Sequence, residues 1–131
     1  MKWILIISVL FFRCIGLAQD HQWKAPESSD ELTNPIAVTD SILLLGKKVY
    51  HAHCSSCHGA KGRGDGIGGI ALQKAPTDFR NPLMMSQTDG NLYWKIATGK
   101  MPMQAYKDVL SDEAIWSVIH YLKLLSEDKK R

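Results

Sequence analysis

The chain has 131 residues, of which 45% are hydrophobic and 22% are charged, and its formal net charge is +3. This is the composition of one small globular domain, too apolar for a disordered chain and too rich in glycine and charge for a membrane bundle. The small net charge argues against a nucleic-acid-binding protein, which needs a clustered basic face. Three cysteines are too few for a disulfide scaffold.

The N-terminus has the pattern of a secretory signal. Lys2 precedes an apolar run over residues 3–12, and a small-x-small cleavage site follows at residues 16–18. The run covers only about half of the roughly 30 Å hydrocarbon core of a membrane, and Arg13 interrupts it, which disfavours an uncleaved anchor. A lipid anchor on Cys14 is also disfavoured, because a lipidated cysteine normally follows a small residue. We expect cleavage after residue 18 and export of the mature chain.

Residues 19–39 are polar and contain two prolines, without helical or strand periodicity, so we expect a flexible leader. A helix is then expected to begin at Asp40 or Ser41 and to run into Cys54, because apolar residues recur at three- and four-residue steps. Gly46 lies inside this helix, at a cost of about 1 kcal/mol relative to alanine. A glycine in that position usually permits close approach by a second helix.

The rest of the chain predicts two further helices and no strand. Residues 59–69 are glycine-rich and are expected to form a surface loop, since they lack the GxxxxGK[ST] pattern of a phosphate-binding loop. A short helix is expected over residues 92–98, stopped by Gly99. The last helix is expected to begin after Ser111, whose hydroxyl can cap it, and to bury one apolar stripe. A basic tail, residues 127–131, ends the chain.

Cys54, Cys57 and His58 form the motif C-x-x-C-H, which is the attachment signature of c-type haem. Two thiols one helical turn apart can form thioethers with the two vinyl groups of the haem, and the adjacent histidine can then bind the iron. Three other interpretations stay open. A thioredoxin-like dithiol needs a βαβ context, and a disulfide would close too short a loop to stabilise much. A zinc site would add two of His51, His53 and His58 to the cysteines, although zinc ligands usually come as two separated pairs.

In this motif and the segments around it, the chain resembles a class I monohaem cytochrome c of the small exported bacterial type. Residues 46–59, GKKVYHAHCSSCHG, are similar to the family's G-x-x-x-Y followed by CxxCH, and residues 110–125, LSDEAIWSVIHYLKLL, to its C-terminal helix. The resemblance implies an all-α cytochrome c fold, with three to four short helices wrapped around one covalently bound haem c. The domains expected are a signal peptide 1–18, a flexible leader 19–39, a cytochrome c domain 40–126 and a basic tail 127–131.

The resemblance also implies further contacts and ligands. The terminal helices of this fold cross closely, which is expected to bring Gly46 and Tyr50 to face Val118 and Tyr121. His58 is implied as the proximal iron ligand.

The second iron ligand of the family is a methionine in the loop before the last helix. Met101 and Met103 both lie there, and the ungapped similarity to G-x-x-P-M-P-x-[YW] favours Met103, with Met101 as the alternative. Pro76 resembles the proline whose carbonyl accepts the N–H of the proximal histidine, a bond that orients the ring and tunes the metal.

These expectations predict an electron-transfer protein rather than an enzyme. His/Met ligation fills both axial positions of the iron, so one electron would enter and leave through the haem edge. The expected partners are a quinol-oxidising complex or dehydrogenase on one side and a terminal oxidase or reductase on the other. The expected location is the periplasm, with membrane contact only through partners or an uncleaved or lipidated N-terminus. Two alternatives stay open: a subunit of a larger membrane respiratory complex, or a haem peroxidase or gas sensor with a labile sixth ligand.

Overall fold

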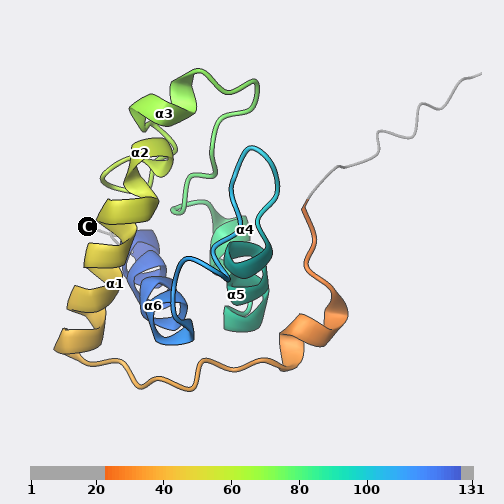
Figure 1. The fold of residues 1–131 in the computed structure, drawn as a ribbon, viewed down its shortest axis with the longest axis vertical. Coiled ribbons are helices and arrows are strands. Elements are labelled where there is room, and N and C mark those ends of the chain that lie inside the picture. The colour runs from red at the N-terminus through yellow and green to blue at the C-terminus, as the bar shows by residue number, and fades with distance from the viewer. Residues whose placement is uncertain (1–22, 128–131) are drawn as a thin grey trace, which may run out of the picture.

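A computed structural model describes residues 23–127 of the chain. The expected signal peptide, with Cys14, and the last four residues of the expected basic tail lie outside the described residues. Within the described range the chain is all-α, as predicted, and no helix there is long and apolar enough to span a membrane. The elements are a 3-10 turn η1 (Glu27–Glu31) and the helices α1 (Asp40–His53), α2 (Ser55–His58), α3 (Ile67–Ile70), α4 (Pro82–Met85), α5 (Asp89–Thr98) and α6 (Asp112–Glu127) (Figure 1).

Side-chain caps determine where the long helices begin. Thr39 caps α1 by accepting from the N–H of Ile42 at 3.2 Å, so the cap precedes the expected positions by one or two residues. Thr88 caps α5 in the same way through the N–H of Asn91, and this helix begins three residues earlier than expected. Ser111 caps α6 as predicted. Each hydroxyl satisfies one of the N–H groups that a helix start leaves without an intrahelical partner.

The close crossing of α1 and α6 is the centre of the fold. A Cβ on Gly46 would lie 2.7 Å from the carbonyl carbon of Ser117 and closer still to its oxygen, so the two backbones touch. One turn further on, the rings of Tyr50 and Tyr121 pack with centroids 5.4 Å apart. The predicted approach of the two helices is therefore present. It places the C-terminal end of α1, where the C-x-x-C-H motif begins, against the core.

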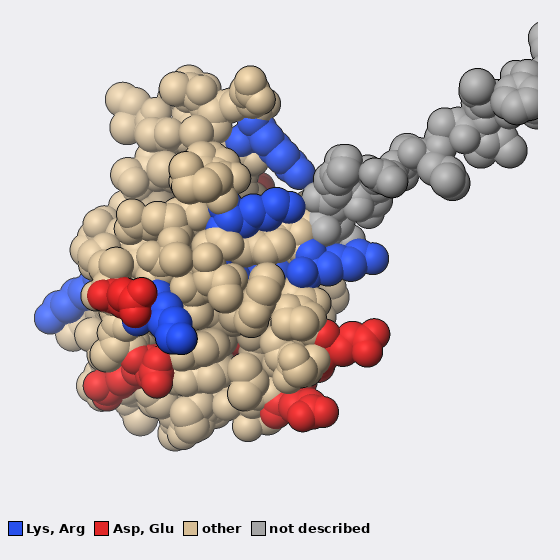
Figure 2. All heavy atoms as spheres, turned by 45° about the vertical axis from the view of Figure 1, so that its right-hand side comes forward, with Lys and Arg blue, Asp and Glu red and all other residues tan. Residues whose placement is uncertain are grey.

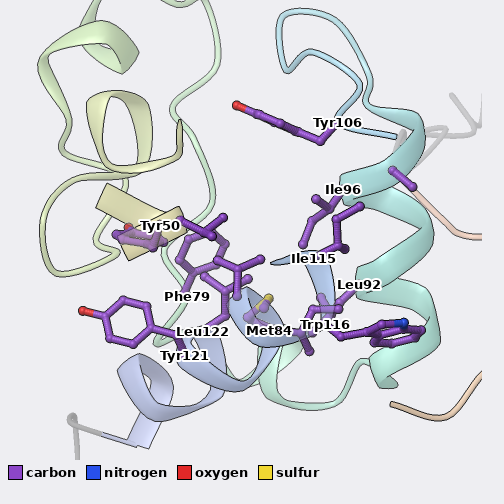
Figure 3. Close-up of a cluster of buried hydrophobic side chains, with 14 residues drawn as sticks. Tyr50, Phe79, Met84, Leu92, Ile96, Tyr106, Ile115, Trp116, Tyr121 and Leu122 are labelled. Atoms are coloured by element: carbon purple, nitrogen blue, oxygen red, sulfur yellow. The ribbon is translucent and has the colours of Figure 1, made fainter. Parts of the chain in front are cut away.

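The core extends from this crossing to α5 and the loop after it (Figure 3). Its buried hydrophobic members are Val49, Tyr50, Phe79, Met84, Leu92, Ile96, Ala97, Tyr106, Ile115, Trp116, Val118, Ile119, Tyr121 and Leu122. The apolar stripe predicted for the last helix is thus its buried face.

Residues 23–39, the described part of the expected leader, contact the rest of the domain. We call residues 23–39 the N-terminal strap, because this segment packs along α5 and α6. Ser29 is 2% exposed, and Thr88 donates to the carboxylate of Asp30 at 2.9 Å. The ring of Trp23 packs on Trp94 with centroids 6.4 Å apart.

Two long-range hydrogen bonds fasten the strap to α6. The side-chain amide of Asn34 donates to the carbonyl of Trp116 at 3.1 Å. Nε2 of His120 lies 2.7 Å from the carbonyl of Ile36. The strap has no periodicity of its own because its order comes from these contacts and not from local propensity. Sequence patterning detects repeats within a segment and carries no signal for such partners.

Candidate haem-binding site

The C-x-x-C-H motif occupies a tight double turn at the end of α1. Cys54 ends α1 by donating its N–H to the carbonyl of Tyr50 at 2.8 Å. Its own carbonyl accepts from the N–H groups of Cys57 at 3.2 Å and His58 at 2.9 Å. This local winding sets the two thiols one turn apart and brings the imidazole directly after the second thiol, as the spacing predicted.

His58 is held from two sides. Its Nδ1 lies 3.2 Å from the carbonyl oxygen of Thr77, and its ring stacks on Phe79 with centroids 4.5 Å apart and planes inclined by 21°. Burial lowers the pKa of His58, and the Thr77 carbonyl offsets part of that effect. A neutral imidazole that donates Nδ1–H to a carbonyl keeps the lone pair of Nε2 for a metal.

The expectation that Pro76 supplies this carbonyl is wrong by one residue. The Pro76 carbonyl points instead at Gly64, where a Cβ would lie 3.2 Å from the carbonyl carbon and closer to the oxygen. Gly64 has φ +76°, a conformation that only glycine adopts readily. The Pro76 carbonyl therefore packs against Gly64 of the glycine-rich loop, and the carbonyl of the next residue, Thr77, faces the His58 ring.

Cys54 and Cys57 are not joined by a disulfide in the structure, and both side chains are half-buried. Burial, with a smaller contribution from Cys57, raises the pKa of the Cys54 thiol to about 12. A protonated, half-buried thiol is a poor redox nucleophile at neutral pH. Across residues 23–127, no group of three or more His, Cys, Asp or Glu side chains is placed to hold a metal ion, so the zinc alternative lacks a ligand set there. His51 is exposed and His53 half-buried.

The loop between α5 and α6 carries both candidate methionines. Lys100 and Met103 pair across a tight turn through two backbone hydrogen bonds of 3.0 and 2.9 Å. Met103 is half-buried and packs against the core, whereas Met101 is 85% exposed. The structure therefore places the two candidates in different surroundings, with Met103 on the inner side of the loop.

Sequence reasoning missed the two tyrosines whose hydroxyls flank the motif. The hydroxyl of Tyr106 donates to the carbonyl of His53, the residue before the motif, at 2.8 Å. The hydroxyl of Tyr50 donates to the carbonyl of Gly59, the residue after it, at 2.6 Å. The sequence predicts a packing role for Tyr50 and a loop position for Tyr106, and no local signal indicates either bond.

The apolar surface around the motif suits a large flat cofactor. Ile67 is 85% exposed and Ile70 is 76% exposed, and both lie on α3, the helix that packs against α2 of the motif. Large apolar side chains exposed beside a site mark a surface that a ligand can cover. The thiol pair, the free Nε2 and this surface together fit haem.

Comparisons with known proteins agree with this geometry. The family described as "Cytochrome C oxidase, cbb3-type, subunit III" matches residues 43–122, which include the motif and both methionines. The chain belongs to this cytochrome c family. The family implies a covalently bound haem c, and Cys54 and Cys57 are present at the attachment positions.

Individual relatives support the same assignment. Cytochrome c550 of Pseudomonas aeruginosa is 26% identical over 115 residues, which cover 82% of this chain and 70% of the relative. Chloroplastic cytochrome c6 of Chlamydomonas reinhardtii is 30% identical over 109 residues, covering 70% of this chain and 68% of the relative. A chain of the reducing HAO-like protein complex of Kuenenia stuttgartiensis has the same fold, with a TM-score of 0.63 and 28% identity. The match covers 80% of the cytochrome described here but only 52% of that chain.

Proposed function

We propose that this cytochrome c is an exported one-electron carrier, with haem attached through Cys54 and Cys57 and its iron held by His58 and Met103. The observation that carries the proposal is the His58 imidazole, which follows the thiol pair directly and faces a backbone carbonyl through Nδ1. When bound, haem supplies a one-electron couple at the iron.

The residues of this chain control that couple through burial and orientation. The Thr77 carbonyl holds the proton on Nδ1 of His58, so that Nε2 is the nitrogen free to bind the iron, and it increases the basicity of that ligand. The ring of Phe79 excludes water from one face of the imidazole. A thioether from Met103 would raise the potential relative to a second histidine and leave no open position for a substrate.

The charge distribution supports transient docking of redox partners near the site. On the face in Figure 2, the upper half carries mainly basic side chains, whereas the lower half carries the acidic side chains together with further basic ones at the lower left. The upper half is the end at which α3 and the α5–α6 loop lie in Figure 1. Such an asymmetry orients weak encounters with an acidic partner surface. The partners we propose are a quinol-oxidising complex or dehydrogenase as donor and a terminal oxidase or reductase as acceptor.

The test of the cofactor is direct. We expect denatured protein on a gel to retain its haem stain, because thioether bonds survive denaturation. An optical and potentiometric titration should then give one single-electron transition. Extraction of the haem by acid–acetone, or zinc in its place, would refute the proposal.

The test of the distal ligand compares two methionine variants. Met103→Ala should remove the weak sulfur-to-iron charge-transfer band of the oxidised protein, lower the potential and open the iron to carbon monoxide. Met101→Ala is the matched control, because its side chain is exposed and should leave the band intact. The reverse pattern would assign the ligand to Met101, and loss in neither variant would mean another sixth ligand.

A second candidate function is a haem-bearing subunit of a larger respiratory assembly. It is favoured by the description of the matched family as a subunit of a cbb3-type oxidase. Size-exclusion of native membranes extracted with mild detergent discriminates the two, since a free carrier elutes as a small monomer and a subunit elutes with its assembly.

A further inference from the structure

Tyr106 connects the α5–α6 loop to the C-terminal end of α1. Its ring is 7% exposed and packs edge-on against the ring of His53, with centroids 5.9 Å apart and planes at 80°. Its hydroxyl donates to the carbonyl of His53 at 2.8 Å. His53 is the last residue of α1, and the last carbonyls of a helix lack intrahelical partners. Tyr106 thus satisfies a helix-end carbonyl that lies one residue before the first attachment cysteine.

The backbone of Tyr106 is anchored independently of its side chain. Its N–H donates to the carbonyl of Ile96 in α5 at 3.1 Å, and its carbonyl accepts from Val109 and Leu110 at 3.0 and 2.9 Å. The side chain therefore extends from a fixed base toward the attachment segment, as Figure 3 shows for its hydroxyl. Because the Tyr106 backbone is fixed, the hydrogen bond of its hydroxyl ties the α5–α6 loop to the end of α1.

Met103 lies three residues before Tyr106, in the turn that Lys100 and Met103 close with two backbone hydrogen bonds. From these contacts, and resting on the proposed His/Met ligation, we propose that Tyr106 is a positioning residue. Its hydroxyl ties the Met103 loop to the haem-attachment segment and keeps the loop closed over the distal side of the iron. Opening of the loop, and with it entry of external ligands, requires this bond to break.

The protein offers a matched control for removal of one hydroxyl. Tyr93 donates to the carboxylate of Asp112 at 2.6 Å on the surface, far from the motif in sequence. Tyr106→Phe and Tyr93→Phe each keep the ring and remove one hydrogen bond.

We would measure two quantities on the haem-loaded variants: hydrogen exchange of the Lys100 and Met103 amides, and the rate of carbon monoxide binding to the reduced iron. Loss of one ordinary buried hydrogen bond should increase opening of the loop roughly fivefold. Tyr106→Phe should therefore accelerate both the exchange of these two amides and carbon monoxide binding by about that factor. Tyr93→Phe should leave both rates at the wild-type value.

The other outcomes are decisive. Equal rates in Tyr106→Phe and Tyr93→Phe would overturn the proposal, and so would uniform acceleration of exchange across all helices, which indicates a structural role alone. Faster amide exchange without faster carbon monoxide binding would overturn the claim that the tie guards the iron. If the wild-type protein lacks the sulfur-to-iron band while the loop amides respond only to Tyr106→Phe, the proposed Met103 ligation fails and the tie stands.

Discussion

Replacement of Gly46 by alanine tests whether a backbone contact between α1 and α6 holds the attachment motif in place. The added Cβ would lie 2.7 Å from the carbonyl carbon of Ser117 and 3.1 Å from Cβ of Tyr121. Non-bonded carbon atoms need about 3.5 Å, so the helices would have to separate by roughly 1 Å. Ser117 meets the new methyl through its main chain, which cannot rotate away as a flexible side chain could.

The magnitude follows from two opposing effects. Alanine is favoured over glycine in a helix interior by about 1 kcal/mol. Overpacking a close-packed interior costs typically about 1–3 kcal/mol, and occasionally more. Because the clash is with backbone at the centre of the core, we expect an overpacking cost at the upper end of that range, about 3 kcal/mol. After the gain in helix propensity, Gly46→Ala should lower the free energy of unfolding by about 2 kcal/mol. For a domain of this size that corresponds to a decrease in Tm of roughly 10 °C.

The assay is urea unfolding of the haem-loaded protein, followed by far-ultraviolet circular dichroism. Lys48→Ala is the control, because Lys48 is exposed on the same helix and its replacement should change stability by less than about 0.5 kcal/mol. Equal or greater stability of Gly46→Ala would show that helix propensity outweighs the contact. The reasoning that this crossing positions the motif would then be wrong.

Three further predictions follow from other parts of the chain. Asn34→Ala should lower the free energy of unfolding by about 1 kcal/mol, measured in the same assay, because it removes the hydrogen bond that fastens the strap to the Trp116 carbonyl; an unchanged value would mean that this bond contributes no stability. The hydrogen bond to Asp112, with burial, raises the pKa of Tyr93 from 10.0 to about 12. The stabilisation by this hydrogen bond should be complete below pH 10 and lost as the pH rises through 12. The free energy of unfolding of Tyr93→Phe should therefore fall less steeply over that pH range than that of the wild-type protein. Parallel curves for the two proteins would contradict the raised pKa of Tyr93. Intact-mass analysis of exported protein should give a chain that begins at Gln19, whereas a mass with the apolar run retained, or with acyl chains added, would contradict cleavage.

The chemistry of the site was predictable because its signal is local. Cys54, Cys57 and His58 lie within five residues, and one turn of backbone is enough to set their spacing. The terminal helices were predictable for a similar reason, since a buried helix face repeats every three to four residues. Gly46 indicated close approach by a second helix, and the resemblance to class I cytochromes c implied that this helix is the last one.

Tertiary structure alone decided which partners these elements meet. The bond from Tyr106 to the His53 carbonyl joins residues 53 apart in sequence, and that from Asn34 to Trp116 joins residues 82 apart. Local periodicity cannot encode such pairs, so the strap was expected to be flexible and the Tyr106 tie was not foreseen. The shift of the His58 acceptor from Pro76 to Thr77 has the same origin. A proline restricts its own backbone, but the carbonyl that faces the imidazole is set by how the glycine-rich loop packs against the segment that contains it.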